Sequence, residues 1–290
     1  MQWLAPRLAL AFAFVFVSLA APRSTEATPV PVPIYTLTCS KAGLPLHVLV
    51  NDVTLKASDD ARSSAMVAPL NSWLQAGTNH LRFRTPPGAT IAPEGRVECK
   101  VVRSRAGEIV STGDDSAGKV IARFEWPGKD AAPAGALDKL VELTLGAKDA
   151  PPCELWRRAE KLTLDDATRA GVLKVVGELQ AAYRANDADR AFALQRFSGE
   201  DWCRCFGEDV EEFRRDGPAQ VREMVEALAD GTVQAWDPAR AQVALVGGGR
   251  VAQITVDGGP PIVVADKKGK GRTTFKPYVA KIDGTFVIVR

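Results

Sequence analysis

Residues Val97-Glu98-Cys99-Lys100-Val101 carry the pattern that decides the fold class of the first half of this 290-residue chain. Apolar and polar side chains alternate one by one, and a period of two is typical of a β-strand that buries one face. The same alternation recurs at residues 33–40, 80–84, 120–126 and 141–145. Turn residues separate these segments, so the sequence predicts an all-β sandwich with antiparallel strands over residues 34–146.

Two cysteines share the apolar face of these strands. Cys39 alternates in step with Leu37, and Cys99 alternates in step with Val101. Two inward-facing thiols in an exported sandwich predict a Cys39–Cys99 disulfide, either between neighbouring strands or between the two sheets. The alternative is that both cysteines remain unpaired in the core.

The second half of the chain follows a different period. Residues 147–152 are a short polar stretch with two prolines, which we interpret as a linker. Val172 and Val176 then recur at helical spacing, behind a capping signature formed by Thr163 and Asp166. We expect this helix to end near residue 186, and further helices at residues 154–161, 188–197, 200–214 and 218–229.

Strands return after residue 231 and continue to residue 290. Gly247-Gly248-Gly249 marks one turn between them, and Asp283-Gly284 is a strong signal for a two-residue hairpin. Helices followed by an antiparallel sheet predict an α+β domain over residues 153–290.

The first twenty residues have the three parts of a secretory signal peptide. Arg7 precedes an apolar run at residues 8–19, and small residues follow from Ala20. We expect cleavage after Ala20, with Ala27 as a later alternative; an uncleaved N-terminal anchor is the other interpretation. The run is shorter than the roughly 20 residues that cross a bilayer. We therefore expect a periplasmic or extracellular protein with a Pro-rich extended leader at residues 21–33 and no stable membrane insertion.

The charge balance argues against nucleic acid as a partner. The chain has 37 Lys and Arg against 35 Asp and Glu, and loss of the signal peptide removes Arg7. Binding to phosphates needs a clustered positive surface, which a balance so close to zero does not suggest. The sequence also lacks a phosphate loop, a dinucleotide fingerprint and a His-Glu-x-x-His motif, so we expect no cofactor.

Each half of the chain resembles a known fold family. Val48-Leu49-Val50-Asn51-Asp52, followed by Leu74-Gln75-Ala76-Gly77-Thr78-Asn79-His80-Leu81, resembles the turns of galactose-binding-type jelly rolls. Asp52 stands where that family usually has glycine, and both motifs are turn chemistry that implies a sandwich without marking a sugar site.

The order of elements in residues 163–290 resembles the NTF2-like (SnoaL-type) cone fold. That family wraps a long N-terminal helix in a curved sheet and leaves a pocket. It contains isomerases and dehydratases as well as non-catalytic binding and immunity modules. The resemblance therefore implies a fold without implying one function.

Three further cysteines, Cys153, Cys203 and Cys205, lie in the second half. A disulfide from Cys153 to either Cys203 or Cys205 would fix the first short helix to the third helix. The three thiolates could instead hold a metal, but structural zinc usually has four ligands and the compartment is oxidising, so we expect no metal. A redox-active Cys203–Cys205 pair is the third interpretation.

The candidate acid–base residues are Asp201 and Tyr183. The chain has only two histidines, and we expect His80 to be solvated and His47 to be a framework residue. The second half has no histidine, so it cannot form a Ser-His-Asp site of its own. A carboxylate such as Asp201 could act as a general acid or base if burial raised its pKa. The other interpretation is a solvated acidic helix face with its aromatic residues in the core.

The candidate binding residues form a basic loop and an aromatic pair. Lys267, Lys268, Lys270 and Arg272 are spaced by glycines and could contact an anionic envelope polymer or an acidic protein surface. The alternative is a flexible, solvated hairpin tip. Trp202 and Trp236 could line the mouth of a cone.

These patterns favour an exported, non-catalytic binding protein that recognises another protein or an envelope glycan. An immunity or inhibitor protein is one version of this hypothesis. The alternative is an NTF2-like small-molecule enzyme with an acid–base pocket. A buried polar cluster inside the cone would favour the enzyme, and a pocket filled by side chains would favour binding.

Overall fold

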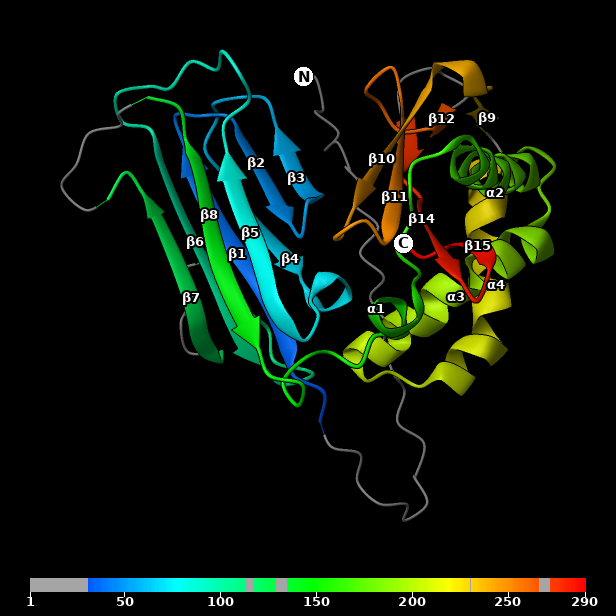
Figure 1. The fold of residues 1–290 in the computed structure, drawn as a ribbon, viewed down its shortest axis with the longest axis horizontal. Coiled ribbons are helices and arrows are strands. Elements are labelled where there is room, and N and C mark those ends of the chain that lie inside the picture. Colours follow the sequence, from blue (N-terminus) through cyan, green and yellow to red (C-terminus); the bar gives the residue numbers. More distant parts are fainter. Residues whose placement is uncertain (1–30, 113–116, 129–134, 230, 266–271) are drawn as a thin grey trace, which may run out of the picture. The chain divides into compact units, whose positions relative to one another are not determined.

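The N-terminal half consists of β-strands in two antiparallel sheets (Figure 1). The computed structural model describes residues 31–112, 117–128, 135–229, 231–265 and 272–290. The predicted signal peptide and the predicted binding residues Lys267, Lys268 and Lys270 lie outside these ranges. The strands are β1 (Ile34–Ala42), β2 (Leu46–Val50), β3 (Val53–Ser58), β4 (Ser64–Pro69), β5 (Gly77–Arg84), β6 (Arg96–Ser104), β7 (Lys119–Trp126) and β8 (Asp138–Leu145).

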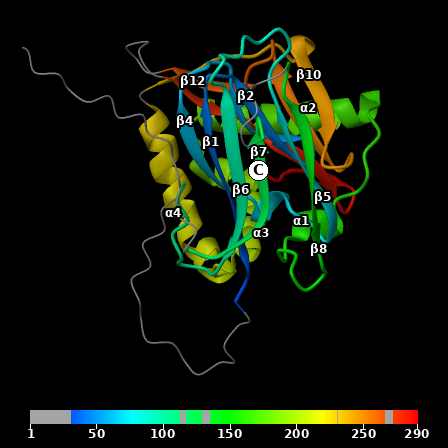
Figure 2. The same ribbon diagram turned by 90° about the vertical axis from the view of Figure 1, so that its left-hand side faces the viewer.

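The two sheets share one apolar core. Sheet A has the strand order β4-β1-β6-β7, and these strands lie side by side in Figure 2. Sheet B has the order β3-β2-β5-β8. Alternate residues of both sheets are buried in the same cluster, and Phe83 of sheet B stacks on Phe124 of sheet A with ring centroids 4.4 Å apart. The alternation of apolar and polar residues thus matches the alternation between the core and the outer faces on strands such as β5 and β6. Strand β1 differs, because Thr36 and Thr38 on its polar face are buried as well.

The asparagines of the two jelly-roll-like motifs meet in the structure. Asn51 and Asp52 form the β2–β3 turn with φ angles of 46° and 66°, a conformation that asparagine and aspartate tolerate. The Asn51 amide donates to Asn79 Oδ1 at 2.9 Å, and Asn51 Oδ1 accepts from the His80 backbone N–H at 2.9 Å. The Asn51 side chain therefore also holds the β2–β3 turn against strand β5 through hydrogen bonds.

The C-terminal half places a group of helices before two antiparallel sheets. The helices are α1 (Glu154–Arg158), α2 (Asp166–Arg184), α3 (Ala188–Phe206) and α4 (Val210–Ala229). The strands are β9 (Thr232–Val233), β10 (Ala241–Val246), β11 (Val251–Val256), β12 (Ile262–Ala265), β13 (Arg272–Phe275), β14 (Tyr278–Ile282) and β15 (Thr285–Ile288). Sheet C has the order β10-β11-β14-β15, and sheet D has the order β13-β12-β9. Two short 3-10 turns, η1 (Asn71–Trp73) and η2 (Pro238–Arg240), complete the elements.

Helix boundaries differ from the sequence-based expectation in three places. Helix α2 is capped by Asp165, whose Oδ1 accepts from the Thr168 backbone N–H at 2.7 Å, and not by the predicted Thr163–Asp166 signature. Helix α3 continues through Gly199, and the Phe213 ring of α4 packs against this glycine. Helix α4 begins at Val210 and contains Pro218, which the sequence analysis places at a helix start.

The Asp283-Gly284 hairpin joins β14 to β15. Both residues have positive φ, 49° and 81°, as a two-residue turn of this kind needs. Ile282 pairs with Thr285 across the turn. Among the described helices, none is long and apolar enough to cross a membrane.

Candidate functional site

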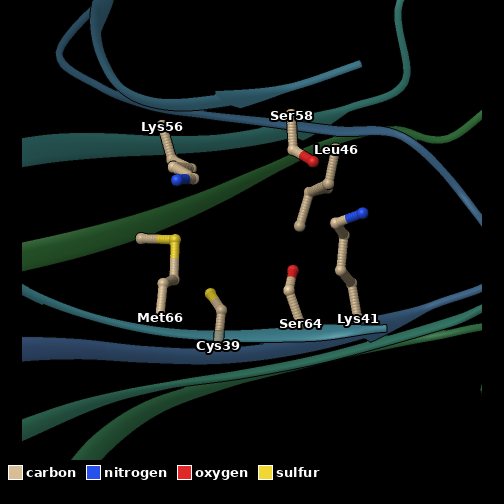
Figure 3. A pocket seen from close by; sticks show the side chains of 7 residues that line it. All are labelled: Cys39, Lys41, Leu46, Lys56, Ser58, Ser64 and Met66. Atoms are coloured by element: carbon tan, nitrogen blue, oxygen red, sulfur yellow. The ribbon is translucent and has the colours of Figure 1, made fainter. Parts of the chain in front are cut away.

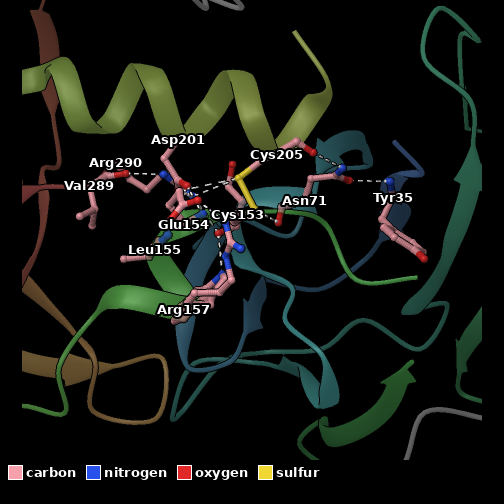
Figure 4. The surroundings of a disulfide bond; sticks show 12 residues. Tyr35, Asn71, Cys153, Glu154, Leu155, Arg157, Asp201, Cys205, Val289 and Arg290 are labelled. Atoms are coloured by element: carbon pink, nitrogen blue, oxygen red, sulfur yellow. Dashed lines mark hydrogen bonds and ion pairs between the residues drawn. A yellow bond between two sulfur atoms is a disulfide. The ribbon is translucent and has the colours of Figure 1, made fainter. Parts of the chain in front are cut away.

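The densest group of buried polar side chains lies where the 3-10 turn η1 meets helices α1 and α3 (Figure 4). We call it the junction and define it by Asn71, Ser72, Asp201 and Arg290 with the Cys153–Cys205 disulfide. Asn71 is fully buried. Its Nδ2 donates to the carbonyl oxygens of Pro33 at 2.9 Å and Cys205 at 2.7 Å, and its Oδ1 accepts from the Tyr35 N–H at 2.7 Å. One amide therefore joins the start of β1 to the end of α3.

The disulfide at the junction joins Cys153 to Cys205, with Cα atoms 4.7 Å apart. Cys153 directly precedes α1, and Cys205 lies in the last turn of α3. The bond spans 52 residues of sequence. In the chain-entropy model, closing a loop of this length stabilises the fold by about 4 kcal/mol.

Asp201 caps helix α1 from a neighbouring helix. Its carboxylate is fully buried. Oδ1 accepts from the backbone N–H groups of Glu154 at 2.5 Å and Leu155 at 3.2 Å, which are first-turn donors without helical partners. Oδ2 accepts from Arg290 Nη2 at 2.9 Å. Asp201 therefore holds α1 and the end of the chain against α3.

Arg290 neutralises that carboxylate inside the junction. Its Nη2 also donates to the Ser72 carbonyl oxygen at 3.1 Å, and its guanidinium lies 5.5 Å from the centre of the Trp73 ring. Burial lowers the pKa of Arg290, and the Asp201 carboxylate opposes that shift. The Arg290 Nε atom is buried without a hydrogen-bond partner among the described residues. A buried ion pair is nevertheless costly to break, because the remaining charge has no partner and no water.

The junction places three candidate metal ligands together, but their chemical form does not suit a metal. The sulfur atoms of Cys153 and Cys205 and a carboxylate oxygen of Asp201 lie within 4.8 Å of one another. Both sulfurs are joined in the disulfide, whereas zinc binds thiolates. The Asp201 carboxylate already forms an ion pair with the Arg290 guanidinium. This donor set forms part of the framework.

The structure does not bring Asp201 and Tyr183 together. Tyr183 belongs to a second core cluster, where its ring lies 5.0 Å from the ring of Phe275. Burial raises the pKa of its hydroxyl above the usual range of tyrosine. Within the described ranges, no hydrogen bond joins Tyr183 to Asp201. The predicted acid–base pair is thus divided between two regions of the core.

The acidic residues around Asp201 divide into buried and solvated groups. Glu200 is buried and binds Arg214 through two hydrogen bonds of 2.8 and 2.9 Å, which tie α3 to α4. The bond to Arg214 lowers the pKa of Glu200. Asp209 and Glu211 are exposed, as expected for a solvated acidic face. Sequence reasoning did not single out Glu200.

Cys203 is a free, buried cysteine. Burial, together with the Glu208 carboxylate 3.9 Å from its sulfur, raises the pKa of the Cys203 thiol to about 12. A thiol that stays protonated is a poor nucleophile. Because Cys205 is bonded to Cys153, the structure offers no Cys203–Cys205 redox pair in the described residues.

The second disulfide joins Cys39 to Cys99, with Cα atoms 4.1 Å apart. The two residues are direct cross-strand neighbours on β1 and β6, so the bond lies within sheet A. Both side chains face the core shared by the two sheets.

The two histidines lie on the outer face of sheet B. His47 Nε2 is 2.8 Å from Asp59 Oδ1, and His80 Nε2 is 3.7 Å from Glu142 Oε1. His80 is half exposed, as expected from the polar side of its strand. Neither histidine lies beside a described nucleophile with which it could form a triad.

The predicted binding residues lie apart. Trp202 is half-buried on α3 and stacks on Phe206 with ring centroids 4.3 Å apart. Trp236 is half-buried and packs against the second core cluster. Arg272 is exposed at the start of β13, beside the residues that lie outside the described ranges. No ring contact among the described residues joins the two tryptophans.

Two small hollows lie in the N-terminal half. The first opens between strands β3 and β4 and is lined by Cys39, Lys41, Leu46, Lys56, Ser58, Ser64 and Met66 (Figure 3). It encloses about 260 Å³ with its open mouth included. The second lies beside Cys99 and Phe124 and encloses about 170 Å³.

Comparisons with known proteins do not supply an identity. No protein-family model, no curated protein and no solved structure matches this chain. Any function must therefore be argued from the chain itself.

Sequence reasoning missed Asn71, Ser72 and Arg290 as members of the junction. Asn71 and Arg290 lie 219 positions apart by their residue numbers, and neither is part of a recognisable motif. The Asn71 bond to Cys205 joins residues that are 134 positions apart. The only local sign of the junction is that the amide residue Asn71 directly follows the apolar Leu70, and this pattern is too common to predict a buried polar site.

Proposed function

We propose that this chain is an exported, non-catalytic binding protein whose partner is another protein or an envelope glycan. The observation that carries the proposal is the state of Asp201, whose two carboxylate oxygens accept hydrogen bonds from two backbone N–H groups and a guanidinium. A general acid or base must exchange a proton with a substrate, and this buried carboxylate has no oxygen facing open space.

The size of the hollows supports the same proposal. Small-molecule sites usually enclose about 300–1,000 Å³, and the two hollows beside Lys41 and beside Phe124 are smaller even with their mouths included. An enzyme that used Asp201 with Tyr183 would need both groups at one cavity. The two residues instead belong to different regions of the core.

The two disulfides support an exported location. Disulfides persist mainly in oxidising compartments, and both bonds here are buried within folded cores. This agrees with the signal peptide that the first twenty residues predict.

The arrangement of elements supports two finer fold proposals. Two antiparallel sheets that share one core favour a jelly-roll type of β-sandwich in the N-terminal half. Helices α2, α3 and α4 come before sheets C and D, and α2 and α3 both contact β15. This order favours an NTF2-like cone whose interior is occupied by side chains such as Val176, Tyr183 and Ile254. A filled cone suits a binding module better than an enzyme.

The proposed contact surfaces are the Trp202–Phe206 pair and the basic loop that ends at Arg272. A half-exposed, stacked aromatic pair offers a flat apolar surface with low conformational freedom, which suits either a sugar ring or a protein side chain. The lysines of the loop lie outside the described ranges, and Arg272 is exposed next to them.

The test is a pull-down from envelope extract and from purified cell wall, with the mature, oxidised protein as bait. Two surface variants are compared: Trp202→Ala, and a loop variant with Lys267, Lys268, Lys270 and Arg272 changed to serine. Arg222→Ser on α4 is the matched control, because Arg222 is an exposed arginine away from both surfaces in sequence.

We expect one enriched partner that is retained at moderate salt by the wild type and by Arg222→Ser, and lost by at least one surface variant. Failure to enrich any protein or glycan from either source would contradict the binding function. Enrichment that both surface variants retain would contradict the proposed surfaces.

A further inference from the structure

Lys41, near the end of β1, is buried inside a group of oxygen atoms. Its side chain is 4% exposed, and it is the only lysine in the buried class among the described residues. Its Nζ lies 2.6 Å from the Asp60 carbonyl oxygen, 2.8 Å from the Arg62 carbonyl oxygen and 3.1 Å from the Leu44 carbonyl oxygen. A fourth oxygen, Asp60 Oδ1, is 3.3 Å away. We call these four oxygens the Lys41 cage.

The cage is built from two loops that the ammonium holds together. Leu44 belongs to the β1–β2 turn, and Asp60 and Arg62 belong to the β3–β4 loop. Besides the ammonium, the Gly43 N–H donates to the Ala61 carbonyl oxygen at 3.0 Å across the same gap. Figure 3 shows the Lys41 amine turned away from the centre of the neighbouring hollow, so the cage is a site distinct from that hollow.

The Asp60 carboxylate and the turn that carries Leu44 also have contacts other than those to Lys41. Arg62 binds the Asp60 carboxylate through its guanidinium at 2.8 Å and through its backbone N–H at 3.1 Å. The Gly43 carbonyl oxygen accepts from the Ala92 N–H at 2.8 Å, which fixes the turn that carries Leu44.

The chemistry of the cage matches a singly charged ammonium. Three carbonyl oxygens and one carboxylate oxygen are acceptors only, and an ammonium has three N–H donors and no acceptor. Calcium takes six to eight oxygens at about 2.3–2.6 Å, and magnesium requires octahedral geometry at about 2.0–2.1 Å. Four oxygens at 2.6–3.3 Å fit neither ion.

We propose that the Lys41 cage is a receptor for primary ammonium ions in which the protein's own lysine is the resident ligand. Removal of the side chain then leaves a site that binds a free alkylammonium ion. Lysine to alanine removes three carbons and the amine, so propylammonium is the ion of matching size. The proposal is independent of the proposed binding function, since it concerns other residues.

Occupancy of the cage also affects the outer face of sheet B. Asp59 directly precedes the cage residue Asp60, and it pairs with His47 at 2.8 Å. The charged groups around this pair are Arg84, which faces His47 across the β2–β5 register, and Asp138, which pairs with Arg84 across the β5–β8 register. An empty cage would release the loop and with it the Asp59–His47 contact.

The test is the thermal stability of Lys41→Ala in increasing propylammonium chloride. Tetramethylammonium chloride at equal ionic strength is the salt control, because it carries no N–H donor. Lys56→Ala is the protein control, because Lys56 is an exposed lysine on strand β3 that also lines the neighbouring hollow. We expect propylammonium to raise the Tm of Lys41→Ala by about 2–4 °C in a saturable way. Wild type and Lys56→Ala should respond equally to both salts.

A Tm of Lys41→Ala that responds equally to both salts would overturn the proposal. If Lys41→Ala does not fold, Lys41→Met keeps the apolar stem and removes only the charge. Hydrogen exchange of the Gly43 amide, which crosses between the two loops, is then the measurement. We expect exchange at least about tenfold faster than in the wild type, which corresponds to about 1.4 kcal/mol. Unchanged protection of Gly43 would overturn the proposal equally well.

Discussion

The two disulfides lie in regions that are held together by different kinds of contact. Cys39 and Cys99 bridge β1 and β6, which already pair along nine residue positions of an antiparallel ladder. Cys153 and Cys205 bridge α1 and α3, where no ladder exists and the other ties are side chains such as Asn71, Asp201 and Arg290. A backbone ladder survives most single substitutions, whereas the junction depends on a few side chains. The junction is therefore the more fragile region.

Breaking the buried ion pair at the junction should have the largest effect. Asp201→Ala leaves the Arg290 charge buried without its partner and removes the acceptor of two helix α1 N–H groups. We expect the free energy of unfolding to fall by about 3–5 kcal/mol, measured by urea titration. Asp216→Ala, on the exposed side of α4, should change it by less than about 0.5 kcal/mol. Equal effects of both variants would contradict the framework role of Asp201.

Removing each disulfide sharpens the comparison between the two regions. The bonds span 60 and 52 residues, so loop closure predicts a similar loss of about 4 kcal/mol for each double cysteine-to-alanine variant. Local opening should differ. Hydrogen exchange of the Glu154 and Leu155 amides should accelerate only when Cys153 and Cys205 are changed. If removal of Cys39 and Cys99 accelerates the hydrogen exchange of these two amides as strongly, the junction does not unfold as a separate unit.

Two helix glycines provide a matched pair in the C-terminal half. A Cβ on Gly199 would lie 1.9 Å from the Phe213 ring, whereas nothing lies within 4 Å of a Cβ on Gly177. We expect Gly199→Ala to destabilise the protein by about 1–3 kcal/mol and Gly177→Ala to stabilise it by about 0.4–1 kcal/mol. Thermal unfolding of both variants measures the difference. A neutral Gly199→Ala would mean that α3 and α4 do not pack at this distance.

The smallest predicted effect is the pH dependence of the β3–β4 loop. Hydrogen bonds from Arg62 and then Lys41 lower the pKa of Asp60 to about 2. A carboxylate with a lowered folded pKa stabilises the fold above its unfolded pKa of about 3.9, and that contribution is lost as the pH falls toward 2. Amide shifts of residues 59–62 should follow this titration in NMR spectra and disappear in Asp60→Asn. A midpoint near 4 would show that the loop contacts are absent in solution.

Local patterns in the sequence were informative wherever one strand or turn determines its own structure. The alternation around Cys99 and around Leu37 predicts which side chains face the core, and those side chains are buried. The Asp283-Gly284 pair predicts a hairpin turn that the structure contains. These features depend on residues that are close in sequence, so a periodic pattern is sufficient to find them.

Helix boundaries and the junction depend on residues that are distant in sequence, so local patterns do not predict them. Gly199 and Pro218 look like helix breaks in the sequence, but α3 continues through Gly199, against which the Phe213 ring of α4 packs, and α4 continues through Pro218. The sequence indicates Asp201 as a carboxylate near aromatic residues, but no local pattern indicates its partner Arg290. The choice of Cys205 over Cys203 as the partner of Cys153 likewise depends on which face of α3 meets α1.

Differential scanning calorimetry tests most directly whether the junction makes the two halves unfold together. The oxidised wild type should show one cooperative transition that includes both halves. A variant with Asp201, Cys153 and Cys205 all changed to alanine should unfold at a lower temperature and in a broader transition, because it loses the disulfide and the buried ion pair and keeps only the contacts of Asn71 and Trp73 between the halves. A single, unshifted transition in that variant would contradict the account, since the junction would then contribute nothing to the stability of the fold.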